Sequence, residues 1–356
     1  MSTTGYSTNH ALTQKLWAKK LNVESLKEAY VSKFIGKGSS SLIQYREETS
    51  KSKGDKITIG LRMQLSGDGT RGDNPLAGNE ESLVTYNDSI YIDQLRHGVR
   101  SDGKMSEQRV LFDLRTEAKS GLKDWWAGRF DTAFFNQICG YTPQTDVRYT
   151  GMQAVVAPDS NHILRAGNVA NDQSVITASI FSLQHVDVCV ERATTLTPAI
   201  RPFMIDGVPK YVMFLHPYQV TQLRTNTNTG QWVDIQKAAM MGGQISKNPI
   251  YTGALGEYNN VVLHSSFYVT QGVNSSTGAA DTLHRRAVFC GAQAAGIAFG
   301  GEDGPDTMSW AEEEFDYGNQ LGVAVGAIWG LKKSVFNSTD FSTIVVTTYA
   351  TATNPA

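Results

Sequence analysis

Histidine and cysteine are the first residue types to search for chemistry, because they act as metal ligands, nucleophiles and general bases. No two histidines have the HxxxH or HExxH spacing that places zinc ligands on one face of a helix. The three cysteines are far apart and form no CxxC pair, which predicts buried reduced thiols instead of a zinc site or a disulfide framework. These residues are His10, His97, His162, His185, His216, His264, His284, Cys139, Cys189 and Cys290.

Motifs for phosphate binding and for a serine nucleophile are also missing from the sequence. There is no GxxxxGK[ST] loop and no GxSxG elbow. Gly67, Gly69 and Gly72 imitate a glycine-rich phosphate loop, but no helix start is predicted after them, so we interpret them as an ordinary loop. His216, at the end of an apolar run, is either a lone ligand or a satisfied core histidine, and we favour the second interpretation.

An acidic cluster near the C-terminal end offers one alternative function. Glu312, Glu313, Glu314 and Asp316 present carboxylate oxygens of the kind that bind a divalent cation. Such a site would make the chain a metal-dependent hydrolase that loses activity when these glutamates become glutamine. Consecutive carboxylates more often form a solvated or ion-paired face, and we favour that interpretation.

A second alternative is a soluble binding or adhesion protein. Residues 66–82 are rich in glycine and polar residues and include the adhesion tripeptide Arg71-Gly72-Asp73. Three-residue matches arise by chance, so we interpret this one as the tip of a loop. The pair Trp125-Trp126 could stack on a nucleic-acid base, but its position in a helical pattern favours core and interface anchors.

Composition narrows the function classes further. Of 356 residues, 40% are hydrophobic and 19% charged, which is ordinary for a globular protein with a substantial core. A net charge of −2 without a basic cluster argues against direct binding of nucleic acid. The N-terminus does not resemble a signal peptide and no run approaches ~20 apolar residues, so we expect synthesis in the cytoplasm and no membrane contact. No cofactor is expected.

The first hundred residues predict an arm followed by a long hairpin. Residues 11–36 have helical apolar spacing, and 36–53 resemble a polar linker. Apolar and polar residues then alternate from 56 to 65, which predicts a half-buried strand, and a second extended run follows at 83–95. The connection between these strands is far longer than the ~2–5 residues of a common hairpin loop, and long loops of this kind are often functional.

The remainder predicts a long helix, an α/β lobe and closing strands. Residues 106–140 keep apolar side chains at helical spacing, with Ser106 as cap and Gly140 as terminator, which corresponds to a rod of about 50 Å. Further helices are expected at 174–196, 217–225 and 232–241. Strands are expected at 211–215, 260–264, 286–290, 322–331 and 343–349. The fold class is therefore α+β.

This order of elements resembles the Hong Kong 97-type capsid fold of tailed bacteriophages. The amino-acid sequences of several segments are similar to those of the major capsid proteins of N-four-type podoviruses. These segments are KGDKITIGL at 53–61, LAGNEESLVTY at 76–86, IYIDQLRHGV at 90–99, IYTGALGEYNNVVLHSS at 250–266 and WAEEEFDYGNQLGVAVGAIWGLKKSVFN at 310–337. The N-terminal LTQKLWAKKL fits as well. The resemblance implies an N-terminal arm at 1–53, an extended hairpin (the E-loop) at 54–104, a peripheral domain at 105–178 with a spine helix at 106–140, an axial domain at 179–300, and a return to the peripheral domain at 301–356.

The resemblance also implies the function, the partners and the contact residues. The chain would be a virion component without enzymatic activity that self-assembles, through heterologous contacts, into an icosahedral head of hexamers and pentamers. The double-stranded DNA genome would be contacted only indirectly, and a scaffold, a portal and a decoration protein would be further partners. We expect the hairpin to dock on a neighbouring copy. The candidate contact residues are Arg62, Arg71, Asp73, Glu80, Glu81, Arg96, Arg100, Trp125 and Trp126.

Overall fold

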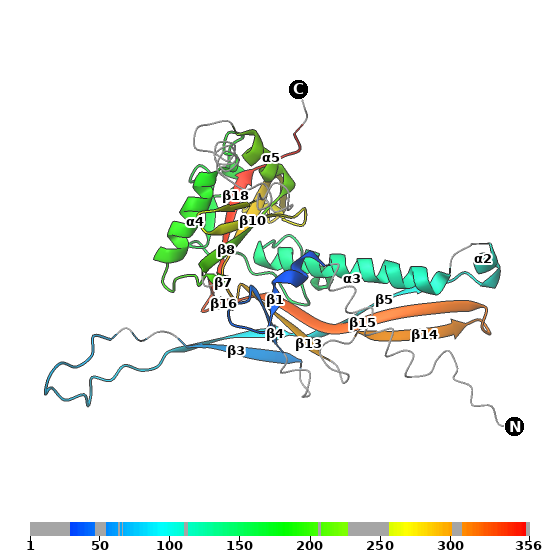
Figure 1. The fold of residues 1–356 in the computed structure, drawn as a ribbon, viewed down its shortest axis with the longest axis horizontal. Helices are drawn as coiled ribbons and strands as arrows, with labels where there is room; N and C mark the ends of the chain where they lie inside the picture. Colours follow the sequence, from blue (N-terminus) through cyan, green and yellow to red (C-terminus); the bar gives the residue numbers. More distant parts are fainter. Residues whose placement is uncertain are drawn as a thin grey trace.

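Two β-sheets, one long helix and one projecting hairpin make up the chain in its computed structural model (Figure 1). The structure describes residues 29–46, 55–62, 65, 67–109, 113–205, 208–226, 256–300 and 308–353. The hairpin and the β14–β15 pair extend in opposite directions along the long axis, and the second sheet with its helices stands to one side. The predicted helix at 232–241, residues 1–28 of the N-terminal arm and residues 47–53 of the linker predicted at 36–53 lie outside the described residues. Where it is described, the linker prediction is wrong for residues 43–46, which form a strand of the first sheet. The last residues of the helix predicted at 11–36 form a 3-10 turn at 30–34 and a short strand at 35–36.

The first sheet has six strands arranged around β15 (Gln320–Lys333). Antiparallel partners of β15 are β13 (Ala295–Gly300) and β14 (Ser309–Phe315) on one side and β5 (Asp93–Arg100) on the other. Beyond β13, the short strands β2 (Ile43–Arg46) and β1 (Ile35–Gly36) continue the sheet in parallel. The predicted strand at 322–331 is therefore confirmed as the central strand of this sheet.

Helix α3 (Leu114–Ile138) packs on this sheet. The Asp113 carboxylate caps its start by accepting the Thr116 N–H at 3.1 Å, and Gly140 follows its end with φ +62°. Its apolar face places Trp126 and Phe130 against Trp329 of β15, with the Phe130 and Trp329 ring centroids 4.8 Å apart. Its 25 residues correspond to about 37 Å at ~1.5 Å per residue.

The prediction of one continuous helix over 106–140 is wrong at its start. A separate short helix, α2 (Lys104–Gln108), follows Gly103, whose φ of +139° breaks the chain direction. Ser106 lies inside α2 and caps nothing, because the stronger cap, Asp113, begins α3 seven residues later. The predicted end at Gly140 is confirmed.

The second sheet has eight strands in the order β6-β18-β12-β8-β10-β9, with β11 beside β12 and β7 beside β8. Its central strands are β12 (Ala280–Cys290), β8 (Val208–Leu215) and β18 (Thr343–Tyr349). The outer strands are β6 (Ile163–Arg165), β7 (Phe203–Ile205), β9 (Gly256–Tyr258), β10 (Val261–Ser265) and β11 (Gln271–Val273). The strands predicted at 211–215, 260–264, 286–290 and 343–349 are confirmed within a few residues.

Both faces of the second sheet are covered, as its runs of apolar residues require. In β8, Met213 and Leu215 face a core shared with α4 (Leu183–Thr195) and α5 (Pro217–Thr225). The alternate residue Phe214 faces α3, where its ring centroid lies 5.4 Å from that of Phe135. The second sheet is thus packed between its own two helices and the end of α3.

The helix predicted at 174–196 is shorter than expected. Ser174 is the last residue of a 3-10 turn, η4 (Asp172–Ser174), residues 175–182 are irregular, and α4 begins only at Leu183. The physical reason is a capping box: the Ser182 side chain receives a backbone N–H while the His185 side chain receives the Ser182 N–H. The helix predicted at 217–225 is confirmed as α5.

Strand pairing divides three of the expected domain ranges between the two sheets. The closing strand β18 does not return to the sheet of β15, because it is buried between β12 and β6 in the second sheet. Residues 295–300, expected in the axial domain, form β13 in the first sheet. Residues 163–165, expected in the peripheral domain, form β6 in the second sheet. In each case the deciding factor is pairing with a strand distant in sequence.

The projecting hairpin consists of β3 (Lys56–Arg62) and β4 (Thr85–Tyr91), paired antiparallel from Lys56 with Tyr91 to Arg62 with Thr85. This confirms the hairpin but shortens it. Residues 93–100, expected within it, leave at Ile92 and become β5 of the first sheet. Remaining short elements are η1 (Tyr30–Phe34), η3 (Val147–Tyr149) and the pair β16 (Val335–Phe336) and β17 (Thr339–Asp340).

Candidate intersubunit surfaces

The tip of the hairpin is open to solvent along nearly its whole length. Residues 67–84 contain no strand or helix and nearly all their side chains are open to solvent. Four apolar side chains are among them or border them, each 45–61% exposed: Leu65, Leu76, Leu83 and Val84. Apolar side chains gathered on a projection, without a core beneath them, are typical of a surface that is buried on another molecule.

The charged side chains predicted as contacts of the tip are exposed. Arg71, Asp73, Glu80 and Glu81 all lie in this segment. Glu81 accepts the Gly67 N–H at 2.7 Å across the base of the loop, and Glu80 accepts the Gly78 N–H at 2.7 Å within it. These glutamates therefore shape the loop itself, in addition to presenting negative charge.

Two further candidates, Arg96 and Arg100, lie exposed on the edge strand β5. The Arg100 guanidinium stacks 4.2 Å above the Phe315 ring and hydrogen-bonds to Gln320, so its position is set within the subunit. Arg62 is the last residue of β3, opposite Thr85, and its side chain lies outside the described part. The structure thus separates these candidates into two groups, one on the hairpin and one on β5.

The two tryptophans have different environments. Trp126 is fully buried between α3 and β15, so its predicted role in the core is confirmed and its predicted role as an intersubunit contact is wrong. Trp125 is partly exposed and stacks on His97 of β5 with ring centroids 4.4 Å apart. The guanidinium carbon of Arg129 lies 4.7 Å from the Trp125 ring centroid and 3.9 Å from the Tyr149 ring centroid. Trp125 thus remains a candidate.

Two strand glycines mark the place where the hairpin contacts its own subunit, a signal that the sequence predictions above do not use. Gly296 of β13 and Gly330 of β15 lie where the root of the hairpin crosses the first sheet: added Cβ atoms would come within 2.6 Å of Ile90 Cδ1 and 1.9 Å of the Tyr91 oxygen, respectively. A glycine inside a strand often marks such a close approach of another segment. The hairpin root is therefore seated on its own subunit, and only the outer part projects.

The acidic cluster does not form a cation site in the described chain. Glu312 is paired with Arg115 at 2.7 Å and accepts the Trp310 indole N–H at 2.9 Å. Glu313 points to the opposite side of β14, because successive strand residues alternate between faces. Among the described residues, no group of three His, Cys, Asp or Glu side chains is arranged to hold a metal ion.

The interpretation of His216 as a satisfied core histidine is confirmed, and the three cysteines are buried as predicted. His216 caps α5 by accepting the Tyr218 N–H at 3.2 Å, as a satisfied and nearly buried side chain. Cys139, Cys189 and Cys290 are buried and free.

Among the described helices, none is long and apolar enough to cross a membrane.

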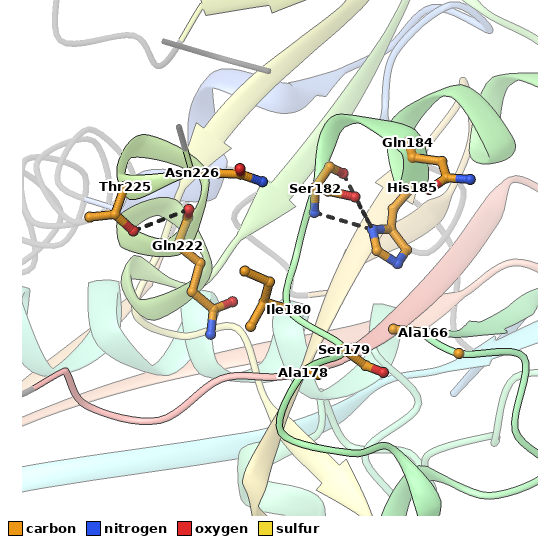
Figure 2. A pocket seen from close by; sticks show the side chains of 11 residues that line it. Ala166, Ala178, Ser179, Ile180, Ser182, Gln184, His185, Gln222, Thr225 and Asn226 are labelled. Carbon is orange, nitrogen blue, oxygen red and sulfur yellow. Dashed lines mark hydrogen bonds between the residues drawn. The ribbon is translucent and has the colours of Figure 1, made fainter. Parts of the chain in front are cut away.

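A cavity of about 520 Å³ opens between α4, α5 and the segment before α4 (Figure 2). It contains a Ser–His contact, Ser182 Oγ to His185 Nδ1 at 3.1 Å, a pairing that nucleophilic catalysis also uses. However, the same Nδ1 atom contacts the Ser182 backbone, as part of the α4 cap, and burial lowers the pKa of His185. Gln222, on the facing helix, is engaged by Phe181 N–H and the Tyr349 oxygen. The polar groups that line this cavity therefore cap α4 and connect α5 to neighbouring segments.

Comparison with known proteins gives one consistent result. A family model described as "Phage capsid protein" matches residues 3–352. The major capsid protein of Pseudomonas phage KPP25 is 28% identical over 93% of each chain. The capsid of Ralstonia phage GP4 is 33% identical over the whole of both chains, with a TM-score of 0.78. The capsid of cyanophage Pam1, 19% identical over 91% of this chain and 93% of its own, shares the fold with a TM-score of 0.73.

Proposed function

Because the chain belongs to the phage capsid protein family, in which it is a major capsid protein with the Hong Kong 97-type fold, we propose that it assembles through heterologous contacts into hexamers and pentamers of an icosahedral head. The observation that carries this mechanism is the hairpin tip. Its exposed leucines have no partner surface on the described subunit. In a heterologous contact, such a projection would dock on a different surface of a neighbouring subunit. The enclosed genome would be double-stranded DNA.

The two sheets suggest a division of labour within the subunit. We propose that the first sheet with α3 is the peripheral domain, and that the second sheet with α4 and α5 is the axial domain at the centre of each hexamer or pentamer. The chain would then cross between the domains at 139–162, at 290–295 and again at 334–342. The finer resemblance to N-four-type podoviruses stays a prediction.

Charge complementarity suggests where the tip docks. Residues 67–84 carry four carboxylates and one guanidinium, whereas the exposed side of β5 presents Arg96 and Arg100. We infer that the tip of one subunit meets the β5 edge of another, with Trp125 beside it. Exposed ion pairs contribute only about 0–1 kcal/mol each, so these charges would set register, and apolar burial at ~25 cal/mol per Å² would supply the affinity.

Further partners are inferred from the function. A closed head requires an entry point for the genome, hence a portal, and assembly would use a scaffold and a decoration protein. Contact with the packaged DNA would be indirect, since the chain has a net charge of −2. The chain is a virion component, and its three buried free thiols agree with synthesis in the reducing host cytoplasm. We propose no catalytic role, and neither the hydrolase nor the adhesion interpretation has support in the comparisons.

Electron microscopy of the purified protein tests this proposal. Shells, tubes or capsomers are expected, whereas a protein that stays monomeric under all assembly conditions would refute the function. Deletion of residues 66–82, with a short glycine linker joining the two strands, tests the role of the tip. Soluble subunits that unfold like wild type but no longer form closed particles are expected, and unchanged particles would reject the docking role.

A further inference from the structure

The root of the hairpin contains a carboxylate where its neighbours are apolar. On the inward face, Ile57 pairs with Ile90 and both are buried on Ala298 of the first sheet. One step further out, Ile59 pairs with Asp88, which is only 9% exposed. A buried aspartate at a position where the pattern calls for an apolar side chain requires compensation by charge and hydrogen bonds.

Asp88 receives that compensation from the end of β15 and the start of β16. One carboxylate oxygen pairs with the Lys332 ammonium, which also donates to the Ser89 oxygen at 3.2 Å. The other oxygen accepts the Val335 N–H at 3.1 Å. The side chains of Asp88 and Lys332 are 8% and 17% exposed, so water screens their attraction little. The hairpin is thereby fixed to a segment 244 residues away.

Support for the hairpin weakens immediately beyond this point. The next inward pair, Leu61 and Tyr86, borders a cavity of about 140 Å³ lined also by Phe336 and Phe341. A second cavity of about 60 Å³ is lined by Gly60 and Leu61 as well. An added Cβ at Gly60 would meet nothing within 4 Å. Packing therefore holds the root but leaves room for the outer strands to tilt.

From these contacts we propose that Asp88 is a positioning residue: its link to Lys332 and to the Val335 N–H sets the direction in which the hairpin leaves the subunit. Because the tip lies far from this pivot, a small change of direction displaces it considerably. The consequence for the shell rests on the proposed docking of the tip on a neighbour: Asp88 then determines how uniformly neighbouring subunits are placed. Apolar packing of Ile57 and Ile90 would keep the root attached, without selecting one direction.

The test compares Asp88→Asn and Lys332→Met, which each remove one charge with little change in size. Amide hydrogen exchange of unassembled subunits is expected to rise about tenfold in residues 85–91 in both variants. Exchange in residues 122–138 of α3 should remain as in wild type. Particles assembled from either variant should show a broader range of diameters by electron microscopy. Lys332→Arg, which keeps the cation, should behave as wild type.

Asp93→Asn is the matched control, because Asp93 is an exposed carboxylate just beyond β4 that accepts only the adjacent Gln94 N–H among its described hydrogen bonds. Unchanged exchange at 85–91, or an equal rise throughout α3, would overturn the positioning role. Raised local exchange together with particles of wild-type uniformity would overturn its link to shell geometry. Failure of the wild-type protein to form particles would reject the proposed function, while the exchange comparison would still decide the role of Asp88.

Discussion

Two guanidinium nitrogens of Arg286 in β12 donate hydrogen bonds to the carboxylate of Asp172, at 2.7 and 2.9 Å. The remaining nitrogen donates to the Cys139 and Gly140 oxygens at the end of α3, at 3.2 and 2.8 Å. Burial opposes ionisation of Asp172, but the positive charge of Arg286 and several hydrogen bonds outweigh it and hold the pKa of that carboxyl below its usual value. One arginine thus joins the end of α3 to the second sheet.

Replacement of Arg286 by methionine should therefore destabilise the whole subunit. Because it leaves a buried carboxylate and two helix-end oxygens without this partner, we expect the free energy of unfolding to fall by about 3–5 kcal/mol. Urea unfolding of unassembled subunits measures it. The control is Arg148→Ala, which removes an exposed ion pair with Asp146 of similar length, 2.6 Å, and should have little effect. Equal midpoints for the two variants would contradict the role of Arg286.

Gly330 should tolerate no side chain, because an added Cβ would lie 1.9 Å from the Tyr91 oxygen. Since the atom in the way belongs to the backbone, Gly330→Ala must shift β4 or β15, and we expect a loss of about 1–3 kcal/mol in unfolding free energy. Gly121→Ala provides the opposite expectation within α3. Its Cβ would meet nothing within 4 Å, so a gain of about 0.5–1 kcal/mol is expected in thermal unfolding. A neutral Gly330→Ala would mean that the hairpin root is not seated as described.

Stability of the subunit should decline in mild acid through buried histidines, among them His216 and His264. Burial lowers the pKa of His216 and of His264 to about 4 each, assisted by the positive charges of Arg285 and Lys33, respectively. Both groups are neutral in either state above their ordinary pKa of 6.5. Between 6.5 and 4 the unfolded chain binds protons that the folded chain excludes, so stability falls as pH falls; below 4 both states are protonated and this contribution levels off.

The slope is expected to be at most about 1.4 kcal/mol per pH unit for each histidine. Urea unfolding at a series of pH values measures it. His264→Gln should reduce the slope between pH 6 and 4 even if it lowers stability at pH 7, because a non-titrating side chain binds no proton. A slope that the substitution leaves unchanged would assign the acid sensitivity to other groups.

Asp131 should control the attachment of residues 30–34 to α3. Its carboxylate accepts the N–H groups of Tyr30 and Val31, each at 3.0 Å. Burial raises the pKa of Asp131, although these two hydrogen bonds oppose the rise. Asp131→Ala removes both bonds, so trypsin cleavage after Lys33 should accelerate by roughly tenfold. Asp124→Ala, an exposed position on the same helix, should leave the cleavage rate unchanged, and equal acceleration by both would contradict this attachment.

Much of the outer architecture follows from local sequence. The alternation at Ile57, Ile59 and Leu61 predicts the hairpin strand because period-2 apolar residues fit only a strand with one buried face. Gly140 predicts the end of α3 because it readily adopts the positive φ required there. The exposed charges at Arg71, Asp73, Glu80 and Glu81 follow from a polar, glycine-rich stretch that cannot bury a core.

The errors arise where a distant partner decides. Residues 93–100 continue the extended run of β4, and nothing local shows that they pair with β15, more than 220 residues away. Trp125 and Trp126 are adjacent and alike in sequence, but the direction of each side chain from α3 makes one fully buried and the other partly exposed. The start of α3 differs from the prediction because Ser106 and Asp113 are both residue types that cap helices: Asp113 caps α3, whereas Ser106 lies within the separate helix α2.

Sequence alone determined the hairpin with its exposed tip, the end of α3, the strand-rich closing segment and the resemblance to phage capsid proteins. Each of these depends on short-range periodicity or on the similarity of short sequence segments. Tertiary structure alone decided which sheet each strand joins, that the hairpin root rests on glycines of β13 and β15, and that Asp88 meets Lys332. Those features depend on contacts between segments separated by hundreds of residues, which local propensity does not encode.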